Sequence, residues 1–120
     1  MSALLAFIIE DDQDLSTIFA DALEAVGYQV EQIKDGLEAR QRLKEEIPFV
    51  ILLDMHLPHV SGADLLKEIK ADERFKDTYV MLTTADARLA ELYEPMADFV
   101  MVKPISFVQL RDLTARLKPK

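Results

Sequence analysis

Residues 49–54 read Phe-Val-Ile-Leu-Leu-Asp, five apolar side chains in a row that end on a carboxylate. A strand with one wet face alternates apolar and polar side chains, whereas a strand covered on both faces is continuously apolar. The run therefore predicts a buried strand of a parallel sheet with Asp54 at its carboxyl end. Similar runs lie at Leu4–Ile9 and Tyr79–Thr83, and shorter ones at Gln29–Ile33 and Phe99–Val102.

Segments with helical periodicity lie between the apolar runs. The segment ahead of Gly27 carries a single apolar stripe, and glycine is typical of the position just after a helix C-terminus. That stripe consists of Leu15, Ile18, Phe19, Ala22, Leu23 and Val26. Further helices are predicted over Leu37–Glu46, over Ala63–Lys70 with Ser61 as N-cap, and after Ser106 with Phe107, Leu110, Leu113 and Leu117 on one side.

Strand and helix alternate five times along the chain. Connections through helices make the strands parallel and the crossovers right-handed, so the predicted fold class is α/β with a single doubly wound sheet. No linker or repeat divides the 120 residues, and we expect one domain over residues 1–120. Ligands of such sheets bind outside the carboxyl ends of the strands, where functional side chains are therefore expected.

The charge balance narrows the possible functions. Asp and Glu number 22 against 14 Lys and Arg, which gives a formal net charge of −8. This argues against direct nucleic-acid binding and against docking on an anionic membrane, both of which rely on basic side chains. Cysteine is absent, which excludes disulfides, zinc–thiolate sites and thiol nucleophiles. Without a membrane-length apolar run or a signal peptide, a cytoplasmic location is expected.

Polar side chains follow four of the predicted strands: Glu10, Asp11 and Asp12 the first, Asp54 the third, Thr83 and Thr84 the fourth, and Lys103 the fifth. Carboxylates that converge on one crevice repel one another and require a cation. Oxygen ligands favour Mg²⁺, whose charge together with one lysine would neutralise three carboxylates. Asp54 could then attack an electrophilic phosphorus while Lys103 neutralises the transferring oxygens.

Each of these residues also has an ordinary structural role. Asp12 or Asp14 is a natural N-cap for the first helix, and an acidic run complements the helix dipole. Asp54 alone is typical of a turn ahead of Pro58, and Lys103 of a solvated strand end. Their joint arrival at the ends of neighbouring strands favours a common site over separate structural roles.

In these motifs the sequence resembles the receiver domain of bacterial two-component response regulators, the CheY-like superfamily. Ile8-Ile9-Glu10-Asp11-Asp12 is similar to the family's acidic motif after the first strand, and Leu52–Pro58, followed by Gly62, to the segment around its phosphoacceptor. Thr84-Ala85 matches the hydroxyl position, and Lys103-Pro104 the lysine–proline pair whose peptide bond is cis in the family. The likeness covers essentially the whole chain. It implies a flavodoxin-like (βα)5 fold with strand order 2-1-3-4-5 and no output domain within these residues.

The resemblance also implies a phosphotransfer function. A sensor histidine kinase or phosphotransfer protein would supply phosphohistidine, and Asp54 would accept the phosphoryl group. Thr84, which follows Asp54 by 30 residues as is usual in the family, and Lys103 would bind the phosphoryl oxygens. The modified domain would then act on a downstream protein or output domain, which makes it a signalling domain rather than an enzyme.

For the metal, the resemblance implies Mg²⁺ with a defined set of ligands. Asp11, Asp54 and the backbone carbonyl of His56 would bind the ion directly, and Glu10 mostly through a coordinated water. His56 and Asp86 occupy two variable positions that influence how fast the phosphoryl group hydrolyses in the family. They are expected to modulate its lifetime rather than to perform the transfer.

The sequence departs from the family near its fourth helix. Val100 stands where the family usually has an aromatic residue, three positions before the lysine. Lys103 follows Thr84 by only 19 positions, fewer than is usual in the family, so a shortened fourth helix is expected. Pro95 predicts that this helix ends by Tyr93. These changes lie on the surface that most receivers use for output.

Other functions compete with phosphoryl acceptance. Val100 and the short helix motivate an alternative, a receiver-like interaction module that signals without phosphorylation. A haloacid dehalogenase-type hydrolase would need a second acid two residues after Asp54, where this chain has His56. A transition-metal site from His56, His59 and Asp54 is disfavoured because Pro58 separates the two histidines in a loop.

Overall fold

The computed structural model describes residues 4–119. Residues 1–3 and 120 lie outside the described part, and the expectation that the chain begins without a signal peptide falls partly on these residues. Five parallel strands form one sheet in the order β2-β1-β3-β4-β5, the predicted topology. The strands are β1 (Leu5–Ile9), β2 (Gln29–Ile33), β3 (Val50–Asp54), β4 (Tyr79–Thr84) and β5 (Phe99–Val102). The helices are α1 (Gln13–Glu24), α2 (Gly36–Glu45), α3 (Gly62–Lys70), α4 (Ala87–Tyr93) and α5 (Phe107–Leu117).

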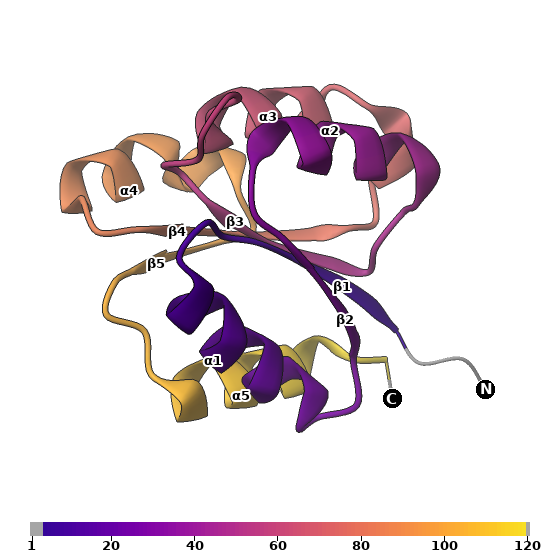
Figure 1. Cartoon of the computed structure of the whole chain (residues 1–120), viewed down its shortest axis with the longest axis vertical. Helices are drawn as coiled ribbons and strands as arrows, with labels where there is room; N and C mark the ends of the chain where they lie inside the picture. The colour runs from indigo at the N-terminus through magenta and orange to yellow at the C-terminus, as the bar shows by residue number, and fades with distance from the viewer. Residues whose placement is uncertain (1–3, 120) are drawn as a thin grey trace.

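The helices cover both faces of the sheet, α1 and α5 on one side and α2, α3 and α4 on the other (Figure 1). All five residues of β3 are buried, as its unbroken apolar sequence predicts. Alternate residues of this strand face opposite cores. Ile51 and Leu53 pack with α2 and α3, whereas Val50 and Leu52 pack with α1 and α5. Two apolar layers therefore hold the strands in register and fix where their carboxyl ends lie.

Side-chain caps start every α-helix. Asp12, Asp35, Ser61, Asp86 and Ser106 each accept a hydrogen bond from a backbone N–H in the first turn that follows. These bonds satisfy donors that a helix cannot satisfy internally. Asp12 is thus the N-cap of α1, the structural role that the sequence offered for it, and Ser61 and Ser106 are N-caps as predicted.

The structure corrects several predicted details. The first strand begins at Leu5, the third is displaced by one residue and the fourth continues to Thr84. Two residues assigned to apolar helix faces are exposed, Ile18 by 42% and Phe107 by 37%. Periodicity shows which residues share a helix face, whereas packing decides how much of that face is covered.

The fourth helix is short, as predicted. It spans seven residues, ends at Tyr93 and is followed by the 3₁₀ turn Glu94–Met96, which contains Pro95. On β5, Val100 packs with the core on the α2 and α3 side, whereas Phe99 packs with the core on the α1 and α5 side. Phe99 therefore does not replace the missing aromatic. Over residues 4–119, no helix is long and apolar enough to cross a membrane.

Candidate functional site

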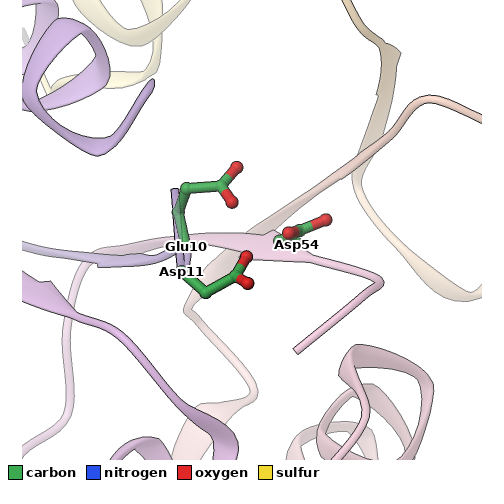
Figure 2. A group of neighbouring side chains, drawn as sticks. All are labelled: Glu10, Asp11 and Asp54. Carbon is green, nitrogen blue, oxygen red and sulfur yellow. The ribbon is translucent and has the colours of Figure 1, made fainter. Parts of the chain in front are cut away.

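Three carboxylates meet at the carboxyl ends of the two central strands β1 and β3. Glu10 and Asp11 follow β1 directly, and Asp54 is the last residue of β3, the neighbour of β1 in the sheet. One oxygen from each lies within 4.8 Å of the others (Figure 2). Glu10 and Asp54 are buried and Asp11 is exposed. Parallel strands that end at the same edge bring these residues together, as the sequence predicts.

Lys103, which follows the edge strand β5, completes this cluster. Its Nζ lies 2.8 Å from Oε1 of Glu10 and 3.4 Å from Oδ1 of Asp54. Its backbone N–H donates to the carbonyl of Thr84 at 2.7 Å, and its peptide bond to Pro104 is cis. One ammonium group therefore contacts two buried carboxylates, and Lys103 is no solvated strand end.

The cluster carries more acidic than basic side chains, and the pKa values of Glu10 and Lys103 are shifted within it. Burial raises the pKa of Glu10 to about 7, because the hydrogen bond from Lys103 only partly offsets desolvation and Asp54 adds to the rise. Burial also disfavours the Lys103 cation, but its contacts with Glu10 and Asp54 outweigh this effect and raise the pKa of Lys103. The cluster thus holds more negative charge than one lysine neutralises, and it can hold a metal ion.

The hydroxyl residues lie at the end of β4, next to β3. Thr83 is the register partner of Asp54, and both Thr83 and Thr84 are buried. Oγ1 of Thr84 accepts a hydrogen bond from the N–H of Asp86 at 3.0 Å. Asp86 itself caps α4 through the N–H groups of Arg88 and Leu89. Because Oγ1 of Thr84 acts as acceptor in this contact, its own proton remains free to donate.

The two histidines do not form a metal site. Both side chains are exposed in the loop after β3, and His59 has a φ of 70°. His56 contributes its backbone N–H, which donates to Oδ1 of Asp54 at 3.2 Å. Within residues 4–119, the only group of three or more metal-ligating side chains close enough to share an ion is Glu10, Asp11 and Asp54.

Two glycines hold this loop in place, a role that the sequence analysis missed. The N–H of Gly62 donates to the carbonyl of Met55, and that of Gly36 to the carbonyl of Pro58. A Cβ added at Gly62 would lie 2.1 Å from the carbonyl oxygen of Asp54, and one at Gly36 would lie 2.1 Å from that of Val60. Backbone this close leaves no room for a side chain. Gly62 already belonged to the motif that resembles the family's phosphoacceptor segment, whereas no motif pointed to Gly36.

The chain belongs to the response regulator receiver domain family, whose sequence model matches residues 6–115. It is 32% identical over 120 residues to the phosphate regulon transcriptional regulatory protein PhoB of Rhizobium meliloti, covering 94% of this chain and 53% of that protein. Its identity to the polar-differentiation response regulator DivK of Brucella ovis is 39% over 80 residues, covering 67% of this chain and 65% of DivK. The chain thus spans about half to two thirds of the length of these curated relatives.

Solved structures share this fold. The receiver domain of the sensor histidine kinase PA1611 from Pseudomonas aeruginosa PAO1 superposes with a TM-score of 0.85 at 23% identity, covering 97% of this chain and 98% of that one. That structure has a magnesium ion coordinated in its active site cleft. Membership of the family makes this chain a signalling domain of the two-component system.

Proposed function

We propose that this receiver domain accepts a phosphoryl group on Asp54 in a Mg²⁺-dependent reaction. The observation that carries the proposal is the meeting of three carboxylates within 4.8 Å of one another, with the Lys103 ammonium 3.4 Å from Asp54. Such a group is unfavourable until a divalent cation neutralises it, and the cation and Lys103 can then bind the oxygens of an anionic phosphoryl group. The donor would be phosphohistidine on a sensor histidine kinase or phosphotransfer protein.

The donor set fits Mg²⁺. The carboxylates of Asp11 and Asp54 offer hard oxygen ligands, and the proposed third ligand, the backbone carbonyl of His56, is also an oxygen. Glu10, which is hydrogen-bonded to Lys103, is assigned to a coordinated water. The magnesium ion coordinated in the active site cleft of the PA1611 receiver domain supports Mg²⁺ as the cation. When bound, the ion neutralises charge on the phosphoryl oxygens.

The chain's own residues perform the transfer. A carboxylate oxygen of Asp54 forms a bond to phosphorus while the bond from phosphorus to the donor nitrogen breaks, and the imidazole leaves with its electron pair. Lys103 and the free proton of the Thr84 hydroxyl bind the phosphoryl oxygens. The His56 N–H and Lys103 both contact Oδ1 of Asp54, so the carboxylate is oriented before the donor arrives.

The phosphorylated domain is proposed to act through proteins. Residues 1–120 form the receiver domain, and its effect passes to a downstream protein or to an output domain outside these residues. Direct contact with nucleic acid or membrane is not part of the proposal, because the net charge is −8. A cytoplasmic location is proposed with this role, since histidine kinases present their phosphohistidine there.

Incubation with Mg²⁺ and acetyl phosphate tests the proposal. Intact-mass spectrometry should show one added phosphoryl group, stable in acid and labile in base, that is absent from Asp54→Asn and lost when the metal is chelated. An adduct that survives Asp54→Asn would place the phosphoacceptor elsewhere. Failure of the unmodified domain to form any adduct would favour the alternative, an interaction module that signals without phosphorylation.

A further inference from the structure

A pocket outside the carboxylate cluster lies between α2, α3 and the 3₁₀ turn Glu73–Phe75. The two helices lie side by side over the same face of the sheet (Figure 1). The pocket has a volume of about 170 Å³, and its apolar side chains are all buried: Leu43, Leu65, Ile69 and Phe75. A cavity of about 150 Å³ with apolar walls holds a molecule of the size of benzene. The pocket therefore has room for one small ring.

Two arginines that line the pocket tie its walls together. Arg40 of α2 donates to both carboxylate oxygens of Glu68 on α3, at 2.9 and 2.7 Å. Arg74 of the 3₁₀ turn donates to the carbonyls of Leu43 and Lys44 in the last turn of α2, at 3.0 and 3.3 Å. Two-bonded guanidinium contacts fix geometry as well as adding energy. The pocket is therefore formed before any ligand arrives.

The charged side chains of the pocket carry one positive charge in excess. Three cations and two carboxylates line it: Arg40, Lys44, Arg74, Glu68 and Asp72. Glu68 pairs with Arg40 at 2.7 Å. Asp72 pairs with Arg74 at 3.0 Å. Lys44 is exposed and forms no ion pair with any residue among 4–119. Because the whole chain has a net charge of −8, this local excess of positive charge favours an anionic ligand.

Flat groups in the pocket favour an aromatic ligand over an aliphatic one. The guanidinium carbon of Arg74 lies 4.8 Å from the centroid of the Phe75 ring. Aromatic pairs gain energy beyond the area that they bury, and guanidinium groups also stack on rings. The single excess charge is an ammonium, that of Lys44, which binds carboxylate oxygens through charge-assisted hydrogen bonds. A ring that carries one carboxylate combines both features.

We propose that the pocket between α2 and α3 binds a small aromatic monocarboxylate. The ring of the ligand packs on Leu65, Ile69 and Phe75, and its carboxylate contacts the Lys44 ammonium. None of the residues that line the pocket belongs to the carboxylate cluster of the proposed phosphoacceptor site. Binding here goes beyond phosphoryl acceptance and does not require Asp54, so either proposal can fail without the other.

The probe is sodium benzoate, titrated into the full chain with labelled methyl groups. The methyl resonances of Leu43, Leu65 and Ile69 should shift and saturate in the millimolar range, because so small a ligand makes few contacts. Two matched compounds each lack one feature, since benzyl alcohol has the ring without the charge and acetate has the charge without the ring. Each should bind roughly tenfold more weakly than benzoate. Equal binding of either compound, or no saturable shift of these methyl groups with benzoate, overturns the proposal.

Lys44→Gln tests the charge. The substitution removes the ammonium at an exposed position, so the domain should stay folded and benzoate should bind roughly threefold more weakly, as for loss of an exposed ion pair. Lys67→Gln is the matched control, because Lys67 is exposed on α3, lies outside the pocket and forms no ion pair with any of residues 4–119. This variant should bind benzoate as the unmodified chain does. The proposal fails if both variants weaken binding equally, which would show general attraction, or if Lys44→Gln leaves the affinity unchanged.

Discussion

Glu10 and Asp54 lie buried side by side with one ammonium group, that of Lys103, between them. Desolvation and the Asp54 charge raise the pKa of Glu10 to about 7, so its ionised form is disfavoured in the folded chain. A buried carboxylate pair of this kind costs folding free energy, which is recovered only when a cation binds. The residues of the proposed site are therefore arranged for binding rather than for stability.

Asp54→Asn should stabilise the metal-free protein. The amide keeps the shape of the side chain and can still accept the N–H of His56, while it removes the charge that repels Glu10. We expect the free energy of unfolding at pH 8 to rise by about 1 kcal/mol, as for relief of a buried like-charge contact. Urea unfolding in the presence of a chelator measures this change.

Asp77→Asn is the matched control. It removes the same charge from an exposed position that forms no ion pair with any of residues 4–119. Its effect should stay within about 0.5 kcal/mol. If both variants stabilise equally, general charge repulsion rather than the site is responsible.

Tyr28 should ionise at a higher pH than an ordinary tyrosine. It is buried, its hydroxyl donates to the carbonyl of Thr114 at 2.7 Å, and burial raises its pKa to about 12. The unfolded chain loses this proton near pH 10 while the folded chain keeps it, so stability is lost as pH rises above about 10. Absorbance at 295 nm should show one tyrosine that titrates well above pH 10, and this step should be missing in Tyr28→Phe. A titration unchanged by that substitution would contradict the assignment.

At the scale of elements, α4 depends on its cap more than the longer helices do. It has seven residues, and Asp86 accepts the N–H groups of Arg88 and Leu89 at its start. Asp86→Ala should lower the free energy of unfolding by about 1 kcal/mol, the usual effect of losing an N-cap. Amide hydrogen exchange should accelerate along α4 before it does in α1.

Asp86→Asn separates capping from charge. Asparagine caps helices about as well as aspartate, so exchange along α4 should stay slow. Any change in the lifetime of the phosphoryl group in this variant then reports the charge at position 86. Rapid exchange in both variants would show that the carboxylate charge, and not the hydrogen bonds, holds the helix start.

The elements also show where sequence patterns succeed. Continuous apolar runs identified β1, β3 and β4, because strands covered on both faces are mostly apolar up to their carboxyl ends. Pro95 correctly predicted the end of α4. Ile18 and Phe107 belong to the predicted apolar helix faces but are exposed, because packing decides how much of a helix face is covered. The close packing of Gly36 on Val60 likewise arises between segments far apart in sequence.

For the molecule as a whole, Mg²⁺ should act as a stabilising ligand. An ion that binds only the folded state adds about 2.7 kcal/mol at a concentration one hundredfold above its dissociation constant. Thermal unfolding should therefore shift upward with Mg²⁺ concentration. Asp11→Ala should abolish the shift while the domain stays folded, because the Asp11 side chain is exposed and contributes little to the core.

Asp14→Ala is the control for this experiment. Asp14 is an exposed acid in the first turn of α1 and lies outside the carboxylate cluster. Its loss should leave the Mg²⁺-dependent shift intact. A shift that persists in Asp11→Ala, or that disappears in both variants, would contradict the metal assignment.

The sequence by itself determined the order of strands and helices, the parallel sheet and the residues at the strand ends, because periodicity and capping are local properties. Only the tertiary structure decided that Lys103 contacts Glu10, 93 positions earlier in the chain. The same packing raised the pKa of Glu10, brought Gly62 against Asp54 and left β5 as an open edge. These features depend on distances between strands and on what covers them, and no local pattern of residues carries that information.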